Sequence, residues 1–67
     1  MITIKCRQLV DNDELSDADD RNDFALGKDE IMEVVSSCND AEEALDRFHS
    51  EYPIGCLEDY EITTEET

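Results

Sequence analysis

A run of carboxylates between Asp11 and Asp23 is the feature that most limits how this chain can fold. The run reads DNDELSDADDRND and contains seven acidic residues, one arginine and two asparagines. Asp and Asn side chains compete for backbone hydrogen bonds, so they favour turns over helix interiors. We therefore expect an acidic connection here, in which Leu15, Ala18 and Phe24 are spaced to anchor a helical turn on the core. The regular elements should lie on either side of it.

Alternation of apolar and polar residues predicts a strand at each end of the chain. Ile2, Ile4 and Cys6 alternate with polar residues within residues 1–10, as a half-buried strand requires. The same period of two recurs within residues 57–64, where acidic residues separate the apolar ones. Both segments are predicted to be strands.

The middle of the chain predicts a further strand followed by the main helix. EIMEVVSS, residues 30–37, is an apolar run of strand length, although so short a run is also compatible with a helix. Asn39 is a suitable N-cap, and Glu42 stands three residues later in the capping-box position. Apolar residues then follow at helical spacing: Ala41, Ala44, Leu45, Phe48 and Tyr52. Pro53 and Gly55 end the helix.

These elements predict a fold of the α+β class in a single acidic domain spanning residues 1–67. Their order is strand, acidic connection, strand, helix, strand. A small antiparallel or mixed three-stranded sheet would carry the one main helix on its inner face and leave the other face wet. A chain of 67 residues can form only a small hydrophobic core. Such a core leaves little room for a deep cleft.

Charge dominates the composition and excludes several classes of function. Twenty acidic residues against five basic ones give a net charge of −15. Such a chain repels nucleic acid and anionic membranes and attracts basic surfaces. It has no apolar run of signal-peptide or membrane-span length, so we expect a cytosolic protein, in the host cytoplasm if the chain is phage-encoded. We also expect a monomer.

Metal binding is not predicted. A calcium loop beginning at Asp17 would place Arg21 at the fifth ligand position and Lys28 at the twelfth, where oxygen ligands are needed. A loop beginning at Asp11 places Leu15 at the fifth position. The one histidine, His49, and the three cysteines all lie more than four residues from one another, so no local zinc motif exists. We expect no metal, no cofactor and reduced cysteines.

Catalysis is not predicted either. Acid-base chemistry requires a group in a pocket that shifts its pKa, and so small a core can hardly form one. His49 has no nucleophile near it in the sequence, and Gly27 followed by Lys28 is not a phosphate-binding loop. The chain is therefore expected not to be an enzyme.

The charge itself is then the candidate for function, carried by two predicted patches. The segment patch consists of the carboxylates of the acidic run: Asp11, Asp13, Glu14, Asp17, Asp19, Asp20 and Asp23. The strand patch lies on the wet side of the last strand: Asp59, Glu61 and Glu65. Carboxylates at fixed positions can occupy the lysine- and arginine-lined groove of a protein that binds nucleic acid.

In its length, its acidity, the DNDELSDADDRND run and its compact mixed fold, the chain resembles small phage-encoded inhibitors that act as DNA mimics. These include anti-CRISPR and anti-restriction proteins. No family motif is matched, so the resemblance assigns no functional residue. It implies binding to a basic nucleic-acid-binding partner, either a host nuclease or a CRISPR surveillance complex.

Two alternatives remain open. One is an acidic antitoxin or immunity-type protein that covers a basic toxin, with Phe24, Leu26 and Tyr52 as apolar anchors, because interface hot spots favour aromatic residues. The other is a solvated accessory domain whose charge serves solubility or growth at high salt.

Overall fold

The central strand is built from the alternation seen at the start of the chain. In the computed structural model, which describes residues 1–66, β1 (Ile2–Gln8) directs Ile2, Ile4, Cys6 and Gln8 into the interior. The two cations between them, Lys5 and Arg7, lie on the opposite, open face of the sheet and are half-buried. β1 therefore supplies the middle of the core.

Two further strands flank β1, in the order β2-β1-β3. β2 (Ile31–Ser36) and β3 (Tyr60–Glu66) both run antiparallel to β1. Ile4 stands opposite Val34 on one side and Thr64 on the other. The predicted three-stranded α+β fold is confirmed, and the sheet is wholly antiparallel.

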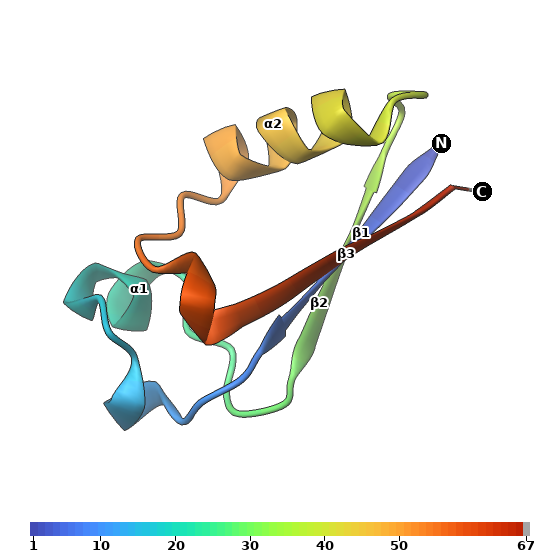
Figure 1. Cartoon of the computed structure of the whole chain (residues 1–67). Coiled ribbons are helices and arrows are strands. Elements are labelled where there is room, and N and C mark those ends of the chain that lie inside the picture. Colours follow the sequence, from blue (N-terminus) through green and yellow to red (C-terminus); the bar gives the residue numbers. More distant parts are fainter. Residues whose placement is uncertain (67) are drawn as a thin grey trace.

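The main helix, α2 (Ala41–Glu51), covers the inner face of the sheet (Figure 1). It buries Ala44 and Phe48 and packs on β1 and β3. The prediction of Asn39 as N-cap is wrong by one residue, because the Asp40 side chain accepts the hydrogen bond from the Glu42 amide at 3.0 Å. Asn and Asp cap helices about equally well, so local preference could not choose between neighbours.

The acidic connection contains two short helical elements rather than irregular turns alone. They are η1 (Asn12–Glu14), a single 3-10 turn, and α1 (Ala18–Asp23). Leu15 and Phe24 are buried as expected, whereas Ala18 is exposed. The Phe24 ring meets the rings of Tyr60 and Tyr52 edge-on, with centroid separations of 5.3 and 6.2 Å. The acidic connection is therefore attached to the core at Leu15 and at Phe24.

The last strand begins three residues later than predicted. Leu57–Asp59 forms a second 3-10 turn, η2, and β3 starts at Tyr60. The acidic segment, η2 and the beginning of β3 gather at one end of the sheet, and β1 begins and β3 finishes at the other end (Figure 1). The three cysteines are free thiols, Cys6 and Cys38 buried and Cys56 half-buried.

Candidate acidic partner-binding surface

Gln8 holds together the two ends of the acidic connection. Its side chain is fully buried, with 0% exposure. The amide nitrogen Nε2 donates to the Val10 carbonyl and to Asn12 Oδ1, each at 2.7 Å. The amide oxygen Oε1 accepts from the backbone amides of Leu26 and Gly27 at 2.9 and 3.2 Å. One side chain thus forms hydrogen bonds to the residues at the start and at the end of the acidic connection.

Asp20 attaches helix α1 to the loop that follows α2. This carboxylate is 2% exposed. Its Oδ1 accepts from the Gly55 amide at 2.8 Å, and its Oδ2 accepts from the Cys56 amide at 3.3 Å. The loop approaches so closely that a Cβ at Gly55 would collide with the Asp17 carboxylate, which explains why glycine stands there.

Three further polar residues fix the backbone of the run. Asp59, 8% exposed, accepts a hydrogen bond from the Ser16 amide at 2.8 Å. Asp17 caps α1 by accepting from the Asp19 amide at 2.9 Å. Arg21 donates through Nε to the Asn12 carbonyl at 3.1 Å and through Nη2 to the Leu15 carbonyl at 2.7 Å. The cation of the run therefore stabilises backbone carbonyls, and no ion pair with a neighbouring carboxylate is found for it within residues 1–66.

Five of the seven residues of the predicted segment patch are exposed: Asp11, Asp13, Glu14, Asp19 and Asp23. We call these five the segment surface. Asp17 is half-buried, and Asp20 lies in the interior. Asp17, Asp19, Asp20 and Asp23 also line a shallow hollow of about 260 Å³ beside residues 53–55. Within residues 1–66, no group of three or more His, Cys, Asp or Glu could hold a metal ion.

The predicted strand patch does not assemble. Asp59 belongs to η2 and is buried, because the 3-10 turn breaks the alternation that the strand prediction assumed. Glu61 and Glu65 are exposed on the open face of the sheet, as expected. There they meet the cations of β1: Glu61 Oε2 lies 3.4 Å from Arg7 Nη2, and Glu65 Oε2 lies 3.2 Å from Lys5 Nζ.

The open face of the sheet is consequently the least acidic part of the molecule. It carries two cations and three carboxylates, namely Lys5, Arg7, Glu33, Glu61 and Glu65. Almost all of the net charge of −15 therefore lies elsewhere. Two of the five basic residues of the chain, Lys5 and Arg7, lie on this face.

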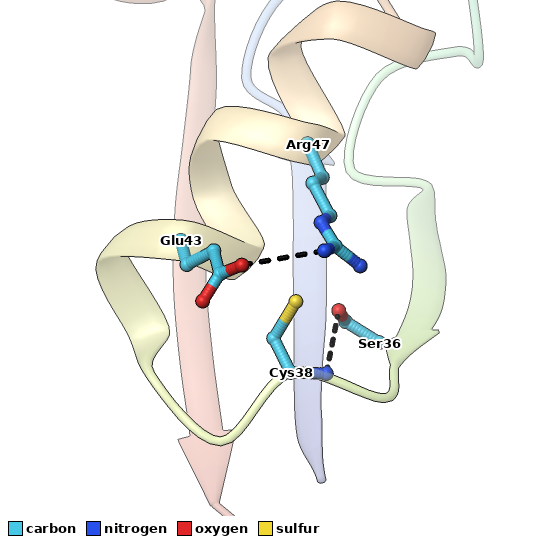
Figure 2. A network of polar contacts seen from close by, with 4 residues as sticks. All are labelled: Ser36, Cys38, Glu43 and Arg47. Atoms are coloured by element: carbon cyan, nitrogen blue, oxygen red, sulfur yellow. Dashed lines mark hydrogen bonds and ion pairs between the residues drawn. The ribbon is translucent and has the colours of Figure 1, made fainter.

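Helix α2 supplies carboxylates that were not included in either predicted patch. Its exposed side presents Glu42, Glu43, Asp46 and Glu51. Arg47 Nη2 lies 3.3 Å from Glu43 Oε1, one helical turn away (Figure 2). Exposed pairs of this kind contribute about 0.5 kcal/mol at most, so α2 remains an acidic surface. The helical spacing of its apolar residues predicts this acidic side from the sequence.

Comparison with family models, with curated proteins and with solved structures found no match to this chain. No family is assigned. Its function is therefore inferred from the geometry and charge described above. Within residues 1–66, no helix is both long enough and apolar enough to cross a membrane.

The interior beneath the acidic segment titrates at alkaline pH. Burial raises the pKa of the Cys6 thiol from 9.0 to about 11. Burial, and then the carboxylate of Asp20, raise the pKa of Tyr60 from 10.0 to about 12. These groups stay protonated in the folded chain at pH values where the unfolded chain has already ionised.

The free energy of unfolding should therefore be intact below pH 9 and fall as the pH rises through 11 and 12. Urea unfolding across this range measures the loss. Tyr60→Phe keeps the ring that packs on Phe24 and removes one ionisable group. Its free energy of unfolding should therefore fall less over this pH range than that of the wild type. Equal losses for the two proteins would contradict a contribution from Tyr60.

Proposed function

We propose that this chain is a non-enzymatic, stoichiometric inhibitor whose acidic surface takes the place of nucleic acid in the basic cleft of another protein. The partner class that fits is a host nuclease or a CRISPR surveillance complex. The proposal depends chiefly on one observation, which is that the segment surface stands on a backbone fixed by hydrogen bonds to the buried side chains of Gln8, Asp20 and Asp59. Carboxylates ordered before binding lose less conformational entropy when a partner arrives.

The dimensions of the molecule support the same proposal. Its longest extent is 36 Å, and one turn of B-DNA measures about 34–36 Å. The acidic segment lies at one end of the molecule and α2 lies along its length (Figure 1). A basic groove that follows one turn of DNA could therefore contact carboxylates from both elements.

An enzymatic function finds no support in the titratable groups. Cys6 and Tyr60, whose pKa values burial raises, lie in the interior and hold their protons more tightly than usual. A nucleophile or general base needs the opposite, a group that ionises near neutral pH. His49 packs its ring against Phe48 at 5.6 Å, in the last turn of α2.

Of the three apolar anchors named for the antitoxin alternative, one lies in the core. Phe24 is buried in the ring cluster with Tyr52 and Tyr60, whereas Leu26 and Tyr52 are half-buried. The exposed large apolar residues are others, and among them Ile31 and Val35 lie on the open face. We therefore retain the nucleic-acid mimic as the proposed function.

A charge-matched pair of variants tests this proposal. The segment variant combines Asp13→Asn, Glu14→Gln and Asp19→Asn, and the sheet variant combines Glu33→Gln, Glu61→Gln and Glu65→Gln. Each removes three exposed carboxylates. The partner captured from a host lysate is titrated with a labelled DNA duplex in the presence of each protein. We expect the segment variant to compete with DNA at least about tenfold less well than the sheet variant, a difference of about 1.4 kcal/mol.

Two other results of this experiment would be informative. Competition by the wild-type chain should weaken steeply as salt is raised, because association steered by charge is screened. A partner that keeps its full DNA affinity while bound to the chain would show that the acidic surface does not occupy the DNA site. Mimicry would then be wrong.

A further inference from the structure

The outer edge of β2 is free to pair with another strand. β1 occupies one side of β2, and within residues 1–66 no strand pairs with the other side. The backbone amide of Gln8 donates to the backbone carbonyl of Glu30 at 3.1 Å. Hydrogen-bonded residue pairs alternate with non-hydrogen-bonded pairs along an antiparallel ladder. Even-numbered residues of β2 therefore bond to β1. The backbone N–H and C=O groups of Ile31, Glu33 and Val35 point away from it.

This edge lacks the features that usually prevent strand addition. Edge strands are commonly protected by charged side chains, proline or bulges. β2 has one carboxylate, Glu33, and no proline or lysine, and its exposed residues Ile31 and Val35 are 60% and 54% accessible. The opposite edge strand, β3, carries three glutamates in its seven residues. β2 is therefore the less protected edge.

A groove beside β2 would receive the side chains of an added strand. Because α2 packs on β1 and β3, it leaves a groove of about 360 Å³ along the inner side of β2. Its apolar lining includes Ile4, Val34, Ala44 and Phe48. Arg47, also a lining residue, extends from α2 toward the end of β2 near Ser36 and Cys38 (Figure 2). Alternate side chains of an added strand face the same side of the sheet, so every second one would enter this groove.

Charge decides which strand fits. Two copies of this chain would bring together two net charges of −15, which repel one another, whereas a cationic segment is attracted. We propose that the free edge of β2 binds an extended segment of the basic partner, with apolar residues facing the groove and a basic residue beside Glu33. This inference rests on the proposed function and adds a second contact to it. The partner would then hold the chain by main-chain hydrogen bonds as well as by charge.

The test uses three synthetic octapeptides as probes. One alternates lysine and valine, the second is the same peptide N-methylated on alternate backbone nitrogens of its pairing edge, and the third alternates lysine and glycine. All three carry the same charge. The wild-type chain should bind the first at least about tenfold more tightly than the second, because N-methylation removes hydrogen bonds to the β2 edge. The amides of Ile31, Glu33 and Val35 should gain protection from hydrogen exchange.

Two variants of Glu33 separate the backbone from the charge. Glu33→Pro removes an N–H that points away from β1, and proline is tolerated at such edge positions. It should abolish the preference for the unmethylated peptide, whereas Glu33→Gln should keep most of it. Circular dichroism identifies any variant that fails to fold, and the comparison of peptides on the wild-type chain needs no variant.

Three results would overturn this inference in distinguishable ways. Equal binding of the lysine–valine peptide and its N-methylated form, still weakened by salt, would exclude strand addition and leave the proposed function intact. Failure of all three cationic peptides to bind would contradict the proposed function as well. Sedimentation that shows a dimer, with protected amides at residues 31, 33 and 35, would assign the edge to a second copy of the chain.

Discussion

Gln8→Glu should lower the free energy of unfolding by roughly 3–5 kcal/mol, because it leaves an uncompensated charge in the interior. The new carboxylate oxygen would stand where Nε2 now donates to the Val10 carbonyl and to Asn12 Oδ1. Two short donor–acceptor contacts would become contacts between acceptors, in a side chain with 0% exposure. Urea unfolding measures the change, and urea is preferred to guanidinium because it does not screen charge.

Asn12→Asp is the matched control for this prediction. It adds the same negative charge at the other end of the same hydrogen bond, but an Asp oxygen still accepts from Gln8 Nε2. Asn12 is exposed, so we expect a change within about 0.5 kcal/mol. Similar losses in the two variants would mean that added charge, rather than the lost donor, governs stability here.

Asp20→Ala should destabilise the chain by about 2–4 kcal/mol. The substitution removes the acceptor for the Gly55 and Cys56 amides, and hydrogen bonds to a charged group contribute roughly 1.5–3 kcal/mol each. Helix α1 would also lose its attachment to the loop after α2. A chain of this size is only marginally stable, so the variant should be partly unfolded at ambient temperature by circular dichroism.

The neighbouring residue provides the control for Asp20. Asp19→Ala removes one carboxylate from the same helix and changes the net charge equally, but Asp19 is exposed. Its substitution should alter the free energy of unfolding by less than about 0.5 kcal/mol. If Asp19→Ala and Asp20→Ala had the same effect, the hydrogen bonds to residues 55 and 56 would not be the source of the stability.

The variants Asp19→Ala and Asp20→Ala also test the proposed function. Asp19 belongs to the segment surface, and Asp20 belongs to the scaffold beneath it. Loss of Asp19 should weaken binding to a basic partner without unfolding the chain, whereas loss of Asp20 should act through the fold. Two adjacent residues of one type are thus expected to have separable effects on binding and on stability.

Much of the fold could be predicted because its elements obey local rules. Period two in residues 1–10 places Ile4 and Cys6 inside and Lys5 and Arg7 on the open face. Helical spacing places Ala44 and Phe48 against the sheet. Gln8 continues the inward-facing series Ile2, Ile4 and Cys6 of the first strand. A polar residue at such a position indicates a buried side chain that forms hydrogen bonds.

The roles of individual carboxylates could not be predicted in the same way. The strand patch required that alternation continue back to Asp59, but a 3-10 turn intervenes and buries that residue. Glu61 and Glu65 kept their predicted face and met cations from a strand more than 50 residues away in the chain. Such pairings depend on register, which a single strand does not specify.

The sequence by itself determined the order of the strands and main helix along the chain, the buried face of the first strand, the last strand and the helix, and the charge of −15 that limits the partners of this protein. Periodicity and net charge are properties of short segments or of the whole composition, so they can be read without a fold. Only the tertiary structure decided which acidic residues support the chain and which are presented to a partner. Asp19 and Asp20 differ because the amides of Gly55 and Cys56, 35 and 36 residues from Asp20, reach one carboxylate and not the other.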